Sequence, residues 1–312
     1  MSRPTSKQVH TDAILSNISI KYSNDNYIAD QVFPFVPVTK QSDKYYIFTK
    51  ADMFRNTAKK RAPGTASEGQ SFGLSTDEYF CEEVAQHTLL EDEVRDNADS
   101  VLSIESAKTT FVTDKILLEL EARIEAMLMT TTNWTNYTTL TGTNQWSDFD
   151  NSDPLTDIDT GKEAIEGSTG KEVNTCVLAY DVWRKLKQHP QLLDRLPVTG
   201  LRQVTLQQFA SLIEVDRVLI GKAKKNTAAE GQTASYSGIW TKDVWLGHVA
   251  SSPAQETPTA GYVFVWKREG KVRGIRRWRE ENIHSEKIEA FMNYDEKIVG
   301  ADLGYTIAAA IA

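Results

Sequence analysis

The chain has 312 residues, of which 40% are hydrophobic and 25% are charged, and its formal net charge at pH 7 is −8. This composition is ordinary for a soluble globular protein. A chain of this length can bury a substantial core as one elaborated domain or as two joined ones. Because the charge is negative, we expect no global attraction to nucleic acid or to an anionic membrane, and only local basic patches could supply it.

The sequence contains neither a secretion signal nor a membrane span. The start of the chain, Met1 to Asp12, is polar, and the longest apolar run, Tyr305 to Ala312, is too short to cross a bilayer. Cys81 and Cys176 belong to no CxxC pair, which favours two free thiols over a disulfide framework or a zinc site. We therefore expect a protein that is made and kept in the cytosol, without membrane contact.

The first forty residues do not resemble the start of a compact domain. Residues 17–40 mix polar residues with large apolar ones, and the run Val32 to Val38 contains two prolines. Proline removes a backbone donor and fixes φ, which excludes helix and central strand here. We expect an extended segment over residues 1–42. Its apolar side chains, Phe33 and Phe35 among them, must be covered by the same chain or by a neighbouring subunit.

A long hairpin is predicted next, with its strands at residues 44–49 and 79–84. Lys44 to Thr49 and Tyr79 to Val84 are rich in aromatic and β-branched residues, as strands are. The stretch between them is rich in Gly, Ser and Thr and has too few apolar residues to build a core. The simplest structure is a mobile β-hairpin arm. Its tip carries four basic residues, namely Arg55, Lys59, Lys60 and Arg61.

The strongest helix signal lies between Asn97 and about Thr130, a stretch without Pro or Gly whose apolar residues recur three and four positions apart. A helix of this length is roughly 45 Å long and is typical of a structural spine. Thr131 to Gly142 then indicates a loop or edge strand, and we assign residues 91–149 to this region.

Helices and strands alternate in the centre of the chain, which predicts an α/β domain over residues 150–265. Asp153 and Pro154 have the pattern of a helix start, and Gly167 is the expected stop. The further expected elements are a strand at 175–179, helices at 181–187, 191–196 and 206–213, and strands at 217–221 and within 239–249. Antiparallel strands are expected at 262–266, 272–278 and 283–294, with a last strand at 306–311.

No motif predicts catalysis, a cofactor or a metal. None of the five histidines takes part in HExxH or another paired metal spacing. Ser168 and Lys171 match a bare SxxK, but the companion motifs of that enzyme class are absent. Carboxylates gather at Glu82 and Glu83 and again at 91–93. A solvated face, or salt bridges to a neighbour, is favoured there over acid–base chemistry.

Basic residues crowd into one stretch near the C-terminus. Interleaved with tryptophan, they could bind nucleic acid, or they could lie at a subunit junction opposite the acidic clusters. The negative total charge favours the junction. The stretch contains Lys267, Arg268, Lys271, Arg273, Arg276, Arg277 and Arg279, together with Trp266 and Trp278.

Several runs of the sequence, in this order and spacing, resemble one group of tailed-bacteriophage major capsid proteins. They are YSNDNYIADQVFPFVPV at 22–38 followed by Lys44-Tyr45-Tyr46 and Phe54-Arg55, VWRKLKQHP at 182–190 with Leu193-Asp194-Arg195, and the stretches 206–213 and 215–222. The resemblance implies an α+β, HK97-like capsid fold, the fold of phage Hong Kong 97. Its parts would be an N-arm (1–42), a β-hairpin E-loop with its connections (43–90), a P-domain spine helix and following loop (91–149), an α/β A-domain (150–265) and C-terminal P-domain strands (266–312).

The resemblance also implies a function, that of a major capsid protein whose pentamers and hexamers form an icosahedral or prolate shell around phage double-stranded DNA. Implied partners are further copies of the chain, a separate scaffolding protein, a portal protein, non-specifically bound DNA and a possible decoration protein. The shell would be non-covalent and assembled in the host bacterial cytoplasm. Candidate subunit-interface residues are Phe33, Phe35, Tyr45, Tyr46, Phe48, Arg55, Lys59, Lys60, Arg61, Glu82, Glu83, Arg273, Arg276, Arg277 and Arg279.

Three alternatives stay open at this point. An encapsulin-like nanocompartment shell shares the implied fold but encloses enzymes instead of a genome. A cytosolic hydrolase would use the carboxylate clusters and would need a deep, apolar-walled pocket. A tail-tube or other virion protein would assemble helically.

Overall fold

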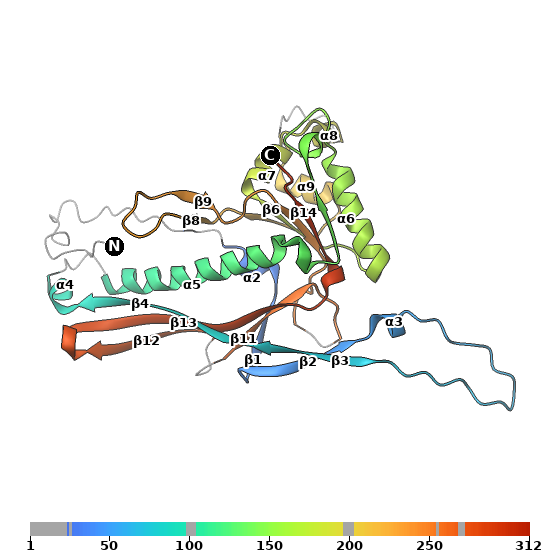
Figure 1. Cartoon of the computed structure of the whole chain (residues 1–312), viewed down its shortest axis with the longest axis horizontal. Helices are drawn as coiled ribbons and strands as arrows, with labels where there is room; N and C mark the ends of the chain where they lie inside the picture. Colours follow the sequence, from blue (N-terminus) through green and yellow to red (C-terminus); the bar gives the residue numbers. More distant parts are fainter. Residues whose placement is uncertain (1–23, 25–26, 98–103, 196–202, 254–255, 268–271) are drawn as a thin grey trace.

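Two five-stranded β-sheets and one long helix organise the fold (Figure 1). The computed structural model describes residues 24, 27–97, 104–195, 203–253, 256–267 and 272–312. Helix α5 (Ile104–Met129) lies along one sheet, here called the lower sheet, and its C-terminal end reaches the other, the upper sheet. This mixture of helices and separate sheets is the α+β arrangement that the sequence predicts.

The lower sheet joins strands from distant parts of the sequence. Its strands are β1 (Phe35–Val38), β4 (Glu82–Glu91), β11 (Gly261–Trp266), β12 (Arg273–Glu280) and β13 (Ser285–Ile298). Their order is β1–β11–β13–β12, and β4 also pairs with β13. All pairings are antiparallel except that of β1 with β11. Helix α5 packs on β4 and β13, and Ile116, Leu120 and Ile124 of its apolar stripe are buried.

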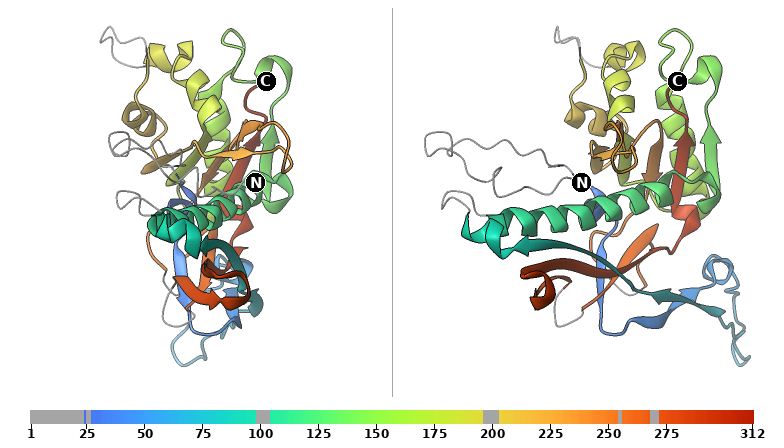
Figure 2. Two further views of the ribbon diagram at one scale, coloured as in Figure 1. Left: turned by 90° about the vertical axis from the view of Figure 1, so that its left-hand side faces the viewer. Right: turned by 60° about the vertical axis from the view of Figure 1, so that its left-hand side comes forward.

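The upper sheet is covered by helices. Its strands, in spatial order, are β5 (Asn136–Thr139), β14 (Gly304–Ala308), β10 (Val244–Gly247), β6 (Thr175–Ala179) and β7 (Arg217–Gly221). All five residues of β6 are buried, as expected for a strand with neighbours on both sides. Figure 2 shows the helices gathered around this sheet, above α5 and away from the lower sheet. They are α6 (Pro154–Thr169), α7 (Tyr180–Leu186), α8 (Pro190–Arg195) and α9 (Leu206–Leu212).

Two hairpins project from the body in different directions (Figure 1). The longer one consists of β2 (Ser42–Phe48) and β3 (Leu74–Phe80), with the single turn of α3 (Lys50–Met53) directly after β2. The shorter one pairs β8 (Lys224–Asn226) with β9 (Tyr236–Gly238) and extends above α5. The β2–β3 hairpin is the long arm that the sequence predicts.

The segment expected to be extended contains a short helix, α2 (Ala29–Val32), so the expectation that it holds no helix is wrong at this point. The helix is possible because Pro34 and Pro37 lie after its last residue, and the chain is extended again from Phe33.

Two expectations about helix ends are also wrong. Asn97 does not lie in the spine helix but caps the short helix α4 (Asp92–Asp96), and residues 98–103 lie outside the described part of the chain. Helix α6 does not stop at Gly167. It continues to Thr169 and is capped by Gly170, whose φ of 64° is a left-handed conformation that glycine adopts without strain.

The strand expected over Tyr79–Val84 is in fact two strands in different sheets. Strand β3 ends at Phe80 and β4 begins at Glu82. The break falls at Cys81, whose N–H donates to the carbonyl of Gln41 at 2.9 Å. The chain thereby leaves the hairpin and crosses to β13.

Several local predictions are confirmed. Asp153 accepts a hydrogen bond from the Thr156 N–H at 3.1 Å, and Pro154 is the first residue of α6. Strand β6 has the predicted bounds, and the Thr-rich stretch after α5 supplies the edge strand β5.

The two cysteines, Cys81 and Cys176, are buried and free. Within the described ranges, no helix has the length and apolar character needed to cross a bilayer.

Candidate functional site

The β2–β3 hairpin exposes large apolar side chains to solvent. Tyr46 is 68% exposed and Phe54 is 66% exposed. Scattered exposed apolar residues are normal on protein surfaces, but a concentration of them marks an interaction site. Here they recur along a single projecting segment, which also exposes Met53, Phe72, Leu74 and Phe80.

The base of this hairpin is fixed to the lower sheet. Tyr45 and Tyr79 both stack on Phe264 of β11, with ring centroids 5.5 and 4.6 Å apart. The Tyr45 hydroxyl also donates to Asp77 across the hairpin at 2.7 Å. Burial raises the pKa of Tyr45, with the hydrogen bond to Asp77 as a second cause, so the phenol stays protonated and able to donate. These contacts therefore anchor the base of the arm to the lower sheet.

The basic residues of the tip are exposed. Arg55 lies 3.6 Å from Asp52, and Lys59 lies 3.0 Å from Glu68. Exposed ion pairs of this kind contribute little to stability. Among the ion pairs that the described residues form, none includes Lys60 or Arg61. The predicted basic tip is therefore present and accessible.

The aromatic residues near the start of the described chain have different environments. Phe33 is 0% exposed and meets the Trp245 ring edge-on, with centroids 5.9 Å apart. Its own chain thus covers it, which is the first of the two kinds of cover that the sequence leaves open. Phe35 is half-buried in β1, and Phe48 packs beside Phe72 of the hairpin with ring centroids 5.6 Å apart.

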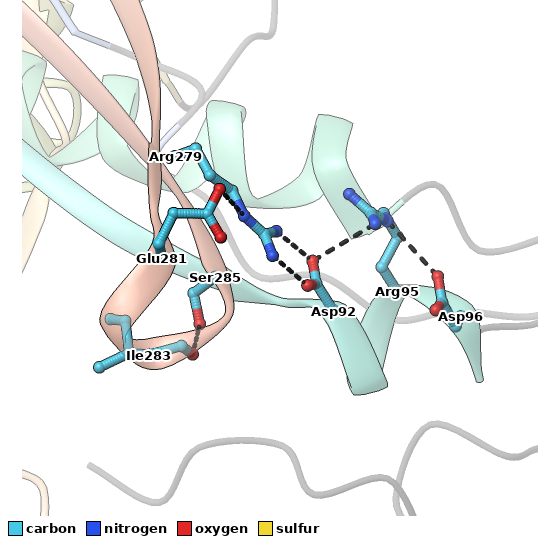
Figure 3. Close-up of polar contacts among 7 residues, drawn as sticks. All are labelled: Asp92, Arg95, Asp96, Arg279, Glu281, Ile283 and Ser285. Carbon is cyan, nitrogen blue, oxygen red and sulfur yellow. Dashed lines mark hydrogen bonds and ion pairs between the residues drawn. The ribbon is translucent and has the colours of Figure 1, made fainter.

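At one end of the lower sheet, Arg279 of β12 meets acidic residues of the same chain (Figure 3). Arg279 donates to the two carboxylate oxygens of Asp92 at 2.6 and 2.5 Å. Asp92 also pairs with Arg95 at 3.3 Å, and Arg95 reaches Asp96 at 3.6 Å. The Arg279 hydrogen bonds lower the pKa of the Asp92 carboxyl. These contacts fasten α4 to the β12–β13 turn, where Arg279 also lies 3.5 Å from Glu281.

A second group of charges lies farther along β12. Arg276 is 3.3 Å from both Glu83 of β4 and Glu289 of β13, and its guanidinium lies 3.7 Å from the centre of the Phe291 ring. Arg277 pairs with Glu105 of α5. The acidic and basic clusters of the sequence therefore do meet, but inside one chain.

Two further candidates, Glu82 and Arg273, are exposed. The interface role of these charged residues stays a prediction, since the structure contains one chain.

Sequence reasoning missed some residues of these surfaces. Phe54, Phe72 and Leu74 were not among the candidates, although each lies within the predicted arm. A sequence signal for them existed, because large apolar residues in a stretch too polar to form a core are expected to be exposed and available for contact. Within the described ranges, no three residues among His, Cys, Asp and Glu are grouped so that they could hold a metal ion.

Comparison with known proteins gives a consistent result. A major capsid protein of Burkholderia phage BcepMu is 24% identical over 304 residues, covering 95% of each chain. A major capsid protein of Pseudomonas phage JBD67 is 30% identical over 237 residues, covering 73% of this chain and 74% of that one. No family model matches the chain.

Solved structures extend the comparison to the fold. A phage-related protein from Bordetella bronchiseptica superposes with a TM-score of 0.72 at 26% identity, covering 96% of this chain and 97% of that one. The capsid structure of cyanophage P-SCSP1u matches with a TM-score of 0.64 at 10% identity, covering 98% and 94%. The fold is thus that of phage capsid subunits, the HK97-like class that the sequence predicts. Within this class, the chain belongs to the family of phage major capsid proteins.

Proposed function

We propose that this protein builds the shell of a phage virion by associating with copies of itself. Pentamers and hexamers are the building units, and the closed shell encloses double-stranded DNA. Closed symmetry sums many individually modest contacts, so a shell needs subunits that present several surfaces. We also propose that the chain acts as a structural protein without catalytic activity, and that it assembles in the host cytoplasm.

A single observation carries this proposal. The β2–β3 hairpin holds exposed aromatic and aliphatic side chains on an arm that its own chain leaves uncovered, with Tyr46, Phe54 and Phe72 all more than half exposed. Burying such surface is favourable by roughly 25 cal/mol per Å². A neighbouring copy is the occupant that a shell always supplies. We therefore assign the arm to subunit contact, as an E-loop does.

The remaining parts are assigned on the same basis. We propose that residues 1–42 form an N-arm, 43–90 the E-loop with its connections, 91–149 and 266–312 the P-domain, and 150–265 the A-domain. A scaffolding protein, a portal protein and a decoration protein are proposed partners, with DNA bound non-specifically. The phage origin of the curated relatives favours a virion shell over an encapsulin-like compartment.

Assembly tests the proposal directly. The protein is expressed alone and with its genomic neighbours, and particles are measured by sedimentation velocity and negative-stain microscopy. The double variant Phe54→Asp with Phe72→Asp should abolish or strongly reduce particles while leaving the subunit folded, because both side chains are more than half exposed. The control is Tyr236→Asp, because Tyr236 is 75% exposed on the other hairpin. Undiminished particles in the double variant would contradict the role of the arm, and protein cargo in place of DNA would favour the compartment.

A further inference from the structure

One carboxylate is buried in the middle of the chain. Glu121 lies on α5, is 0% exposed, and takes part in no ion pair among those formed by the described residues. Burial raises the pKa of this carboxyl, while hydrogen bonds from Trp240, Ala29 and Ile28 act in the opposite direction. Burying a carboxylate is unfavourable unless its oxygens are satisfied. Its partners therefore indicate what it does.

Three N–H donors from two distant parts of the chain converge on Glu121. The backbone N–H of Ile28 lies 3.2 Å from Oε1 and 3.0 Å from Oε2, and that of Ala29 lies 2.8 Å from Oε2. The indole N–H of Trp240 donates to Oε1 at 2.6 Å. All three partners only donate, so the ionised carboxylate, which only accepts, is the form that fits.

The first two donors belong to residues 27–33, here called the strap. Three further residues of the strap, Tyr27, Gln31 and Phe33, contact the rest of the chain. The Tyr27 hydroxyl donates to Asp114 of α5 at 2.9 Å, and Arg217 of β7 donates to the carbonyl of Gln31 at 3.0 Å. With Phe33 packed against Trp245, the strap contacts both α5 and the upper sheet. It therefore connects helix α5 to the upper sheet.

The third donor belongs to the connection between β9 and β10. Trp240 is buried, and a Cβ added at Gly221, the last residue of β7, would lie only 2.1 Å from its ring. The indole thus packs directly against the backbone of β7 at Gly221, where any larger residue would displace it. Through this ring, Oε1 of Glu121 is fixed relative to the upper sheet.

We propose that Glu121 is a latch that couples the strap to the β9–β10 connection, so that loosening either one loosens the other. Oε1 is shared by the indole and the Ile28 N–H, and Oε2 by the Ile28 and Ala29 N–H groups. Losing the indole lets the carboxylate rotate away from the strap donors, and losing the carboxylate leaves three buried donors unpaired. The latch is a property of a single subunit and stands independently of the proposed shell.

Hydrogen exchange on the full-length subunit tests the coupling. The informative variant is Trp240→Phe, which keeps an aromatic ring against Gly221 but removes the one indole donor. Exchange is followed by mass spectrometry in peptides covering 27–33 and 236–247. We expect Trp240→Phe to accelerate exchange within the strap by about tenfold, a typical size for coupling between sites. If the exchange rate of the 27–33 peptide is unchanged in this variant while the variant remains folded, the proposal is overturned.

Glu121→Gln provides the reciprocal measurement. The amide has the same shape but replaces one acceptor oxygen with a donor group, so exchange should accelerate in both peptides. Glu121→Asp keeps the carboxylate and should restore part of the protection. The control is Glu119→Gln, an exposed residue on the same helix, which should change neither peptide. If Glu121→Gln accelerates only one of the two peptides, the latch does not couple them.

Discussion

Arg279 and Asp92 form a two-point ion pair, with N–O distances of 2.6 and 2.5 Å, that joins the edge strand β12 to helix α4 (Figure 3). Such fork-to-fork geometry is specific to the planar guanidinium. The pair lies at one end of the lower sheet. It joins a residue of the basic cluster to a residue of an acidic cluster that lies far from it in the sequence. Its effect is local, because exposed charges are screened by solvent.

Arg279→Gln should raise the pKa of Asp92 towards its ordinary value. The pKa is lowered first by the hydrogen bonds from Arg279, and glutamine supplies neither the charge nor both donors. Carboxyl titration of Asp92 by NMR measures the change. Glu281→Gln serves as the control, because Glu281 contacts Arg279 but not Asp92 in this cluster. An Asp92 pKa that is equally low without Arg279 would show that another group sets it.

Phe33→Ala should lower the free energy of unfolding by about 3–5 kcal/mol, the usual cost of removing a fully buried phenylalanine. The side chain is 0% exposed, and its contact with Trp245 is lost with it. Tyr46→Ala should change the same quantity by less than about 0.5 kcal/mol, because Tyr46 is mostly exposed. Denaturant unfolding of the dissociated subunit measures both. A small effect at Phe33 would mean that the strap does not stay packed in solution.

The contrast between these two residues shows what the sequence could predict. Helix α6 and strand β6 were placed from local signals, an N-cap followed by proline and a short apolar run. Phe33 lies between the short helix α2 and Pro34, where local pattern says nothing about which distant side chain covers it. Its burial depends on Trp245, a partner more than two hundred positions away in the sequence. Cover of this kind is decided by tertiary packing.

Glu121 was missed for a different reason, although a signal existed. It lies three residues before Ile124 and seven before Leu128, which places it on the buried face of a helix. A charged residue at such a position indicates a satisfied buried group. Its donors could not have been predicted, because two are backbone N–H groups and the third comes from the distant Trp240. The pairing of Arg276 with Glu83 within one chain was likewise visible only as two complementary clusters.

Two glycines of α6 should respond to alanine in opposite directions. Gly167 has open space around the position of a Cβ, so Gly167→Ala should stabilise the protein by about 0.5–1 kcal/mol through helix propensity. At Gly161 a Cβ would lie 2.9 Å from side-chain carbons of both Leu246 and Tyr305. Gly161→Ala should therefore destabilise by about 1–3 kcal/mol through overpacking. Chemical denaturation compares the two, and equal effects would contradict the close approach of α6 to the upper sheet.

Glu125 should make the subunit less stable as the pH rises from about 4.3 to about 7. Burial raises the pKa of this carboxyl to about 7, with repulsion from Asp243 as the second cause and Lys225 opposing both. Because the folded pKa lies above the unfolded one, the stabilising contribution is complete below about pH 4.3 and is lost as the pH rises to about 7. Above neutrality, Glu125→Gln should therefore be more stable than the natural protein. Since Glu125 is only partly buried, we expect a gain of about 1 kcal/mol.

The sign of this effect separates it from ordinary acid denaturation, in which stability falls as the pH is lowered. Unfolding free energies of the natural protein and of Glu125→Gln, measured from pH 4.5 to pH 8.5, should diverge with rising pH. Glu119→Gln on the exposed side of the same helix should follow the natural protein. Parallel curves for the natural protein and Glu125→Gln would mean that the carboxyl is already ionised at low pH in the folded state. In that case burial and the charge of Asp243 would not raise the pKa of Glu125 in the folded subunit.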